Sequence, residues 1–218
     1  MMLDFTTVPP YLNYLLNGAL WTVIILVLAT AISFVFGVLI ALGKLYAPSL
    51  LRWPLRFVTF VIMGTPLLLQ LFMIYYGLSQ IGINLPAFWT GVVGLGLHYA
   101  VYNSVILQAA IETVDQGQME AARSLGFGRR AAFWHFILPQ AVMDAVPQMG
   151  NNTIILLKDT SLLSVLGITE LVLASQLAIS RTFRPFEFYI TAAAMFYVIN
   201  LAMEWVLRRL ARNVEAIR

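Results

Sequence analysis

Two long stretches of this chain carry no charged side chain, and they decide what it can fold into. Residues 5–43 and 57–111 contain no Asp, Glu, Lys or Arg. Of the 218 residues, 61% are apolar and 11% are charged, whereas an average globular chain is about a quarter charged. A soluble domain of this composition could not cover its surface with polar groups, and a disordered chain would be much less apolar. The sequence therefore predicts an all-α polytopic membrane protein.

A membrane-spanning helix needs about 20 mostly apolar residues, and five segments meet or approach that requirement. We expect spans at about 18–42, 57–77, 86–110, 147–168 and 187–207. The second span is interrupted by Gly64-Thr65-Pro66, and the fourth is the least apolar because it contains Asn151 and Asn152. Together the five spans would form a single transmembrane domain over the whole chain, 1–218.

The basic residues beside the spans predict which loops are cytoplasmic, because cytoplasmic loops hold the excess of Lys and Arg. With five spans and a cytoplasmic C-terminus, the inner side holds Lys44, Arg52, Arg56, Arg123, Arg129, Arg130, Arg208, Arg209, Arg212 and Arg218. The outer side holds Lys158, Arg181 and Arg184. The N-terminus would lie outside, and it lacks the basic segment of a cleavable signal peptide. Basic residues this few and dispersed do not predict a nucleic-acid-binding face.

The connection between the third and fourth expected spans, residues 111–146, is the longest on the cytoplasmic side. Its first part is rich in helix formers up to Gly126, which can take the left-handed conformation at a helix end. Its second part places Phe133 and Phe136 on one helical side, and Pro139 then turns the chain toward the bilayer. Such an amphipathic helix can seat in a partner's groove or lie flat on the membrane, and composition alone leaves both open.

Four motifs in this sequence resemble those of one protein family. Glu120-Ala121-Ala122, with Gly126 and then Ile137-Leu138-Pro139, resembles the cytoplasmic "EAA" loop of permease subunits of ABC importers. Three further segments resemble one branch, the polar amino-acid permeases similar to those for histidine, glutamine, arginine and glutamate. They are Gly64-Thr65-Pro66 through Gln70 to Phe72, Gly117-Gln118, and Leu157-Lys158-Asp159-Thr160-Ser161-Leu162. The likeness covers nearly the whole chain in the expected order.

The resemblance implies the permease subunit of a type I ABC importer in the bacterial inner membrane. It implies a dimer of two permease subunits, identical or different, on a separate ATPase dimer that binds ATP and Mg²⁺. A binding protein outside would deliver a polar amino acid or related small solute, and this chain would be no enzyme. The residues implied to couple to the ATPase are Glu120, Ala121, Ala122, Gly126, Arg129, Phe133, Phe136, Leu138 and Pro139. For Glu120 the alternative is a helix-start charge that offsets the helix dipole.

Polar and helix-breaking residues inside the spans mark the expected translocation path, because such groups are costly in a bilayer. The set comprises Gly64, Thr65, Pro66, Gln70, His98, Tyr102, Asn103, Asn151, Asn152, Lys158 and Asp159. The break at Gly64 could aim backbone groups at a solute or be a kink for packing. Gln70, His98 and the asparagines could contact solute or bond to neighbouring helices.

Two other features of the spans have alternative interpretations. Gly96, Ala100 and Ser104 form a stripe of small residues at a spacing of four. Such a stripe favours close helix packing, and the dimer interface is one place for it. Lys158 and Asp159 are expected at the outer mouth, as part of an ion pair or as a site for an α-carboxylate.

One pattern of the resembled branch is missing from this sequence. Its members commonly carry Tyr-x-x-Glu-x-x-Arg in the inner part of the third span, and here Tyr102 is followed by Val105 and Gln108. The charged pair that could neutralise the ends of an amino acid is therefore absent. Either the partner permease supplies these groups, or the solute differs, for example an opine, ectoine or betaine-like compound.

Catalytic and metal chemistry are not predicted for this chain. The stretch from Gly37 to Gly43-Lys44 has the wrong spacing for a phosphate-binding loop, so ATP would bind elsewhere. Without cysteine there is no thiolate metal site. The two histidines, His98 and His135, lie far apart in the expected membrane topology, so they cannot bind one metal ion together. The alternative function is an ATPase-independent secondary transporter or channel. It would require inverted repeats and intramembrane carboxylates. The sequence shows no inverted repeat, and the interiors of the apolar spans hold no Asp or Glu.

Overall fold

The computed structural model describes residues 3–215, with side-chain surroundings up to residue 210, and every regular element in it is helical. The α-helices are α1 (Leu12–Tyr46), α2 (Ser49–Met63), α3 (Leu67–Phe72), α4 (Leu78–Gln80), α5 (Ala87–Thr113), α6 (Gln116–Ser124), α7 (Arg129–Ala132), α8 (Leu138–Asp159), α9 (Leu171–Thr182) and α10 (Pro185–Glu215). Phe5–Thr7, Pro9–Tyr11 and Thr160–Leu166 are 3₁₀-helical, and Met73–Gly77 and Phe133–Ile137 are π-helical. The all-α prediction is confirmed.

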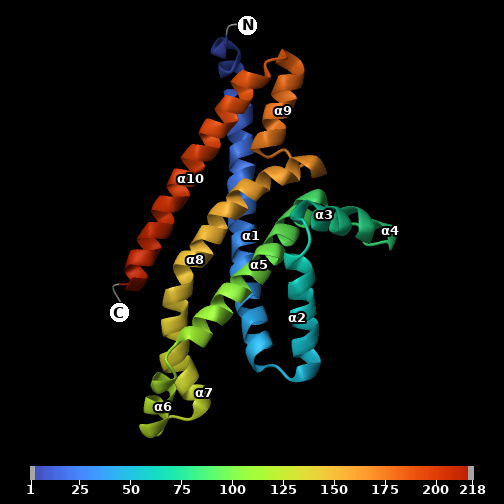
Figure 1. Cartoon of the computed structure of the whole chain (residues 1–218). Helices are drawn as coiled ribbons and strands as arrows, with labels where there is room; N and C mark the ends of the chain where they lie inside the picture. The colour runs from blue at the N-terminus through green and yellow to red at the C-terminus, as the bar shows by residue number, and fades with distance from the viewer. Residues whose placement is uncertain (1–2, 216–218) are drawn as a thin grey trace.

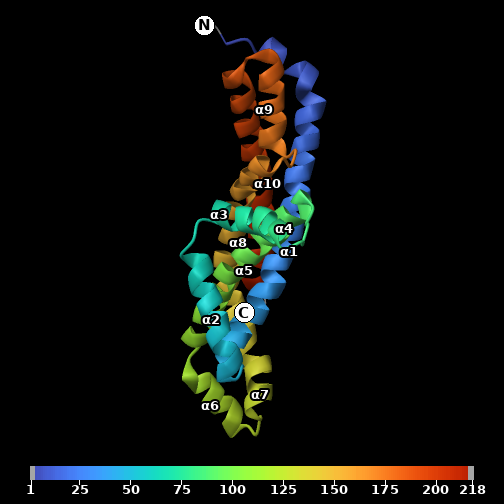
Figure 2. The ribbon, with the colours of Figure 1, turned by 90° about the vertical axis from the view of Figure 1, so that its right-hand side faces the viewer.

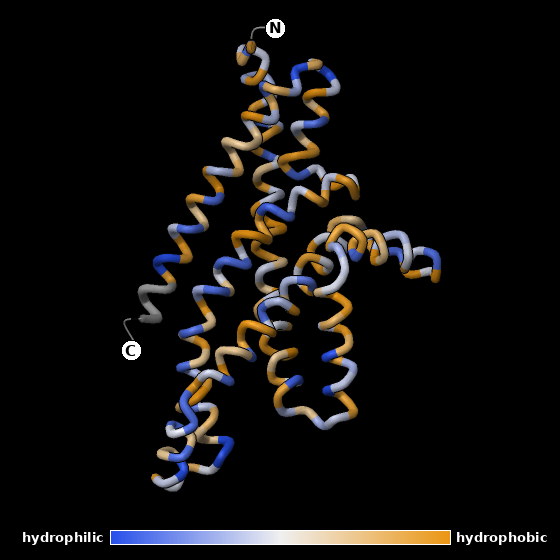
Figure 3. Tube along the Cα trace, viewed as in Figure 1, coloured by the Kyte–Doolittle hydropathy of each residue, from blue (hydrophilic) through white to orange (hydrophobic). Residues whose placement is uncertain are grey.

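The helices form a long bundle with α1 running along most of its length (Figure 1). The short helices α6 and α7 lie at one end, and α9 with the start of α10 lies at the other; a second view at a right angle shows the same order (Figure 2). Hydrophilic residues gather around α6 and α7 (Figure 3). This arrangement separates the expected cytoplasmic loop from the N-terminal end of the bundle.

In the described part of the chain, three helices are long and apolar enough to cross a membrane, namely Phe5–Tyr46, Ala87–Thr113 and Pro185–Leu210. Two bent pairs bring the number to five if each pair counts as one span. The first pair joins α2 to Leu67–Gln80 with a bend of 114°, and the second joins Arg129–Leu166, which contains α8, to α9 with a bend of 49°. The expected interruption of the second span is therefore much sharper than a proline kink.

The fourth expected span differs from the observed helix at its start. We expected it to begin near residue 147, whereas α8 begins at Leu138 and contains Pro147 in its interior. Pro139 lies in the first turn of α8, where the missing N–H of proline costs nothing. The part of the chain between α5 and α8 is accordingly shorter than the loop 111–146, because α5 also continues to Thr113.

The stripe of small residues on α5 packs against α1 of the same chain. A side chain at Gly96 would come within 2.7 Å of the Ile32 Cβ, and one at Gly37 of α1 would come within 3.2 Å of the Ala100 carbonyl oxygen. The Lys44 ammonium donates to the Ser104 hydroxyl at 3.0 Å. The stripe thus provides close helix packing, as expected, but α1 covers it, so it is not a dimer face.

A cluster of charges closes the bundle at the N-terminal end. The Asp4 N–H donates to the Glu187 carboxylate at 3.0 Å, and Arg184 lies 3.6 Å from the same carboxylate. The Thr6 hydroxyl and N–H both donate to the Asp4 carboxylate and hold its pKa below the usual range. These contacts tie the first residues of the chain to the start of α10 at the end opposite α6.

Candidate coupling surface and translocation path

Glu120 lies on an exposed face of α6, at the tip of the bundle (Figure 1). The first turn of α6 holds no acidic residue, and the Asp115 carboxylate caps the helix by accepting from the Gly117 N–H at 2.6 Å. Because Asp115 already compensates the helix start, a dipole role for Glu120 has no support. Its carboxylate has no hydrogen-bond or ion-pair partner among the described residues, so it is available to another protein.

Gly126 ends α6 in the left-handed conformation, with φ at +89°, as the sequence predicted. The Phe127 N–H donates to the Ala122 carbonyl and the Gly126 N–H donates to the Arg123 carbonyl, a Schellman-type ending. Ala122 is buried against the rest of the loop while Ala121 is exposed. Ala122 therefore holds α6 in place, and Ala121 forms part of its exposed surface.

The two phenylalanines of the second part occupy different environments. Phe133 is buried and its ring lies 5.1 Å from the ring of Tyr46 at the end of α1. Phe136 packs on Phe127, with ring centroids 5.0 Å apart, just after the end of α6. Phe133 therefore anchors the loop to the bundle, and a partner would meet the exposed Arg129 and Pro139 rather than this ring.

The side chain of Gln70 bridges the break in the second span by hydrogen bonds. Its amide nitrogen donates to the Ile62 carbonyl at 2.8 Å, the Thr65 carbonyl at 3.0 Å and the Thr65 hydroxyl at 2.8 Å. Its oxygen lies 2.9 Å from Nδ1 of His98 on α5. Pro66 has no N–H, so the break leaves carbonyl groups of the preceding turn without a helical donor. Gln70 satisfies them and at the same time links the break to α5.

The aromatic and acidic residues near the break bond to one another. The ring of His98 lies 5.0 Å from that of Tyr102 and 5.2 Å from that of Tyr99. The Tyr99 hydroxyl donates to the Asp159 carboxylate, so Asp159 is held by α5 rather than by the neighbouring Lys158. Asp159 thus sits at the end of α8 in contact with the third expected span.

The three asparagines of the expected path divide between the interior and the surface. Asn152 donates to the Asn103 side-chain oxygen at 2.9 Å, and Asn103 donates to the Ser33 hydroxyl at 3.2 Å. This chain of bonds joins α8, α5 and α1 through the bundle. Asn151 is exposed and makes no side-chain hydrogen bond within the described part of the chain, which leaves it directed at the surroundings of the bundle.

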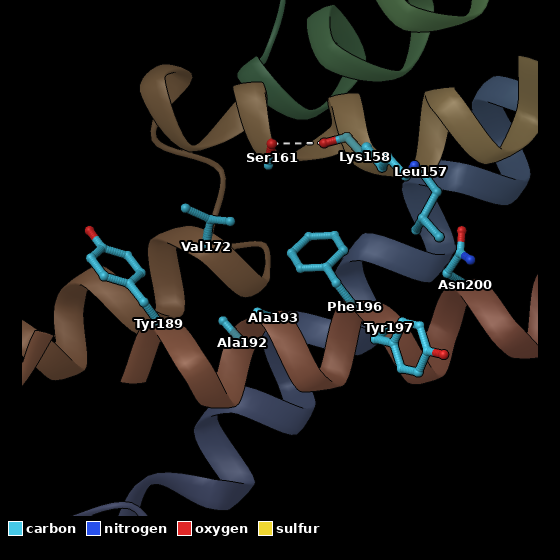
Figure 4. Close-up of a pocket in the computed structure, with 10 residues that line it drawn as sticks. All are labelled: Leu157, Lys158, Ser161, Val172, Tyr189, Ala192, Ala193, Phe196, Tyr197 and Asn200. Carbon is cyan, nitrogen blue, oxygen red and sulfur yellow. Dashed lines mark hydrogen bonds between the residues drawn. The ribbon is translucent and has the colours of Figure 1, made fainter. Parts of the chain in front are cut away.

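A cleft of about 610 Å³ lies between the end of α8, α9 and α10. It is lined by Leu157, Lys158, Ser161, Val172, Tyr189, Ala192, Ala193, Phe196, Tyr197 and Asn200 (Figure 4). Lys158 is its one charged lining residue, and the Ser161 hydroxyl donates to the Lys158 carbonyl at 2.7 Å. The Asn200 amide donates to Glu204 at 2.8 Å, while its oxygen is buried without a partner among the described residues.

The residues of α10 in this cleft were not among those expected from the sequence. Three of them, Tyr189, Phe196 and Tyr197, are aromatic residues in an apolar helix. Contact with lipid explains aromatic residues there as well as contact with a solute does. Asn200 could have been identified from the sequence, because an amide side chain inside an apolar helix needs a hydrogen-bond partner. A metal site is absent among the described residues, which hold no group of three His, Asp or Glu able to bind one ion.

Residues 33–216 match the protein family described as the binding-protein-dependent transport system inner membrane component. The arginine transport system permease protein ArtQ of Bacillus subtilis is 32% identical over 99% of both chains. The octopine transport system permease protein OccM of Rhizobium meliloti is 34% identical, covering 80% of this chain and 75% of its own. A crystal structure of an amino acid ABC transporter with histidines is 37% identical, with a TM-score of 0.91 over 98% of this chain and 100% of that one. This chain belongs to the family of inner membrane components of binding-protein-dependent transport systems, permease subunits that are not themselves enzymes and whose ATPase is a separate subunit.

Proposed function

We propose that this chain carries an amino acid, or a small solute of amino-acid type, across the inner membrane when ATP is hydrolysed by an ATPase bound to α6. The coupling role rests on Glu120, which is exposed on α6 and has no side-chain partner among the described residues. A binding protein at the opposite end would deliver the solute. ATP and Mg²⁺ would be bound by the ATPase subunits, and a second permease subunit would complete the path.

The orientation in the membrane follows from the same placement. The α6 end holds Arg123, Arg129 and Arg130, and the expected excess of basic residues lies on that side. The N-terminal end holds Asp4 and Glu187 beside Arg184. By the positive-inside rule, α6 faces the cytoplasm and the N-terminus faces outward.

The cleft beside α10 is our candidate for the solute site. Its aromatic walls and single ammonium group, that of Lys158, suit a small solute with a carboxylate. The relatives named for arginine and octopine, and the amino acid transporter with histidines, favour solutes that carry an α-carboxylate and a basic group. Lys158 is the one charged residue that lines the cleft and it is positive, so we expect the carboxylate rather than the basic end to be recognised there.

Reconstitution tests the function directly. The chain, its ATPase and its binding protein in proteoliposomes should take up labelled arginine, glutamine, histidine or octopine only when ATP is supplied to the ATPase side. A set of vesicles without ATPase is the control. Uptake driven by a proton gradient in those control vesicles would instead identify a secondary transporter.

Replacing Lys158 by methionine should raise the KM for uptake and leave the maximal rate of ATP hydrolysis with empty binding protein unchanged. A hydrogen bond to a charged group contributes about 1.5–3 kcal/mol, so KM should rise by about tenfold or more. Lys158→Arg keeps the charge and is the matched control. An unchanged KM in Lys158→Met would remove Lys158 from the solute site.

A further inference from the structure

The segment 43–56, here called the inner turn, joins the end of α1 to the start of α2. Both views place it toward the α6 end of the bundle (Figures 1 and 2). It connects the expected spans 18–42 and 57–77, so the chain leaves the lipid hydrocarbon and returns to it within this segment. The inner turn is therefore expected at the depth of the lipid headgroups, which border the hydrocarbon.

The three basic residues of the inner turn have no carboxylate partner among the described residues. Lys44 is buried, and its ammonium donates to the neutral Ser104 hydroxyl at 3.0 Å. The Nε and Nη2 groups of Arg52 donate to the Ala47 carbonyl at 3.2 and 2.9 Å, which holds the guanidinium in place and leaves Nη1 available. Arg56 is exposed and makes no side-chain hydrogen bond or ion pair with the described residues. The two ion pairs that these residues do form both involve α10.

The start of α2 is an unfavourable place for two arginines. Arg52 and Arg56 are four residues apart on one side of the helix, where like charges repel each other. The first turn holds no acidic residue, and Pro48 provides no side-chain cap. The N-terminal end of a helix also carries a partial positive charge of its own. A negatively charged group bound here would reduce all of these repulsions.

The side of α2 that carries Arg56 continues as an exposed aromatic stripe. Trp53, Phe57 and Phe60 are spaced by three and four residues, so they lie on one side of the helix together with Arg56. Trp53 is 72% exposed, Phe57 67% and Phe60 77%. Tryptophan is common at the headgroup level, and Phe60 lies about 6 Å farther along the helix axis than Arg56. A positive group at the headgroup level is thus followed by an apolar surface that extends into the hydrocarbon.

We propose that the inner turn and the first half of α2 bind an anionic phospholipid. Its phosphodiester accepts from the guanidinium groups of Arg56 and Arg52, whose planar N–H groups match phosphate oxygens. Its acyl chain lies along Phe57 and Phe60. Basic clusters beside a span on the cytoplasmic side are typical sites for anionic headgroups. The site goes beyond the proposed transport function, and it depends on the proposed orientation only for the leaflet that supplies the lipid.

The arrangement of charge and aromatic rings favours a lipid over other occupants. A two-fold contact between two copies of this surface would place like surfaces together, so the arginines would face arginines. A soluble protein would not reach Phe60, which lies inside the expected span 57–77. Inorganic phosphate would satisfy the arginines and leave the aromatic stripe uncovered. A lipid with a negative head accounts for both parts of the surface.

Labelling with photoreactive lipids tests the proposal. The full chain, co-purified with its ATPase, is placed in phosphatidylcholine vesicles that contain a small fraction of phosphatidylglycerol with a diazirine on its acyl chain. Phosphatidylcholine with the same diazirine is the comparison probe. After irradiation, mass spectrometry should find adducts on the peptide that contains Phe57 and Phe60. The phosphatidylglycerol probe should give at least about fivefold more of them, the factor that one Lys or Arg contributes near anionic lipid.

Arg56→Gln should lower the phosphatidylglycerol adducts on α2 by about fivefold and leave the phosphatidylcholine adducts unchanged. The fold should persist, since the Arg56 side chain bonds to no described residue, and co-purification with the ATPase verifies this. Arg56→Lys keeps the charge and should retain an excess over Arg56→Gln. Arg209→Gln is the matched control, because it removes the same charge from the C-terminal part of α10, where Arg209 lies over the Trp205 ring. It should leave the adducts on α2 unchanged.

Four outcomes would overturn the proposal. They are equal labelling of α2 by the two probes, an unchanged excess in Arg56→Gln, capture of a second copy of the chain in place of lipid, and loss of the labelling when millimolar inorganic phosphate is added. The comparison of the two probes on the unaltered chain is decisive even if a variant does not fold. The labelling needs neither ATP nor solute, so its failure is distinguishable from a failure of the proposed importer function.

Discussion

Replacing Glu120 by alanine should stop ATP-driven uptake while the chain still folds and inserts in the membrane. Its carboxylate is exposed on α6 and bonds to no described residue, so its removal leaves the bundle intact. If Glu120 is desolvated against the ATPase, truncation costs about 2–5 kcal/mol, and 2 kcal/mol corresponds to roughly a 30-fold loss of affinity. The measurements are co-purification of the ATPase from detergent and uptake by proteoliposomes.

Glu112→Ala is the matched control for this prediction. It removes the same charge near the end of α5, where Gln108 donates to the Glu112 carboxylate at 2.9 Å, but it lies outside α6. Glu120→Ala should lose the ATPase while Glu112→Ala retains it. Equal losses in the two variants would indicate a general charge effect, and full retention in Glu120→Ala would contradict docking through this residue.

Replacing Gln70 by leucine should destabilise the break in the second span more than any other single change near it. Leucine has a similar size but leaves the Ile62 and Thr65 carbonyls without the donor that Gln70 supplies. An unsatisfied polar group costs about 1–3 kcal/mol, and two carbonyls and a histidine nitrogen lose their partner together. We expect a lower thermal midpoint of the purified importer, faster proteolysis between α2 and α3, and a loss of uptake.

Two variants bracket the effect of Gln70→Leu. Gln176→Leu makes the same chemical change at an exposed residue of α9 that has no side-chain hydrogen bond within the described chain, and its midpoint should not fall. His98→Leu removes one bond and leaves the three donated by Gln70 in place, so its effect should be smaller. A loss in His98→Leu as large as that in Gln70→Leu would show that the link to α5, rather than the carbonyls, holds the break.

Hydropathy predicted the three long apolar helices and their order because apolar composition over about 20 residues is a local property of the sequence. It also predicted that the second span is broken, since Gly64 and Pro66 cannot continue a regular helix. The direction of the break could not be predicted in the same way. It depends on bonds from Gln70, which lies after the break, to Ile62 before it and Thr65 within it, and on the contact with His98, which is 28 positions away.

The candidate solute cleft was only partly predictable for a similar reason. Lys158 stood out as a basic residue next to a span, but the cleft needs α8, α9 and α10 to meet, and no local pattern encodes that meeting. The end of α6 was easier to predict. Gly126 predicts a helix end by its own backbone freedom, and the exposed Glu120 belongs to the same short helix.

The two π-helical turns, Met73–Gly77 between α3 and α4 and Phe133–Ile137 between α7 and α8, have a common geometric meaning. Each turn accommodates one residue more than an α-helix would hold, and one residue corresponds to a rotation of about 100° around the helix axis. The surplus residue sets the angular register of everything beyond it, so the direction in which α4 presents its side chains after the first turn, and α8 after the second, depends on that insertion. The orientations of α4 and of the start of α8 about their helix axes are thus each determined by a single extra residue.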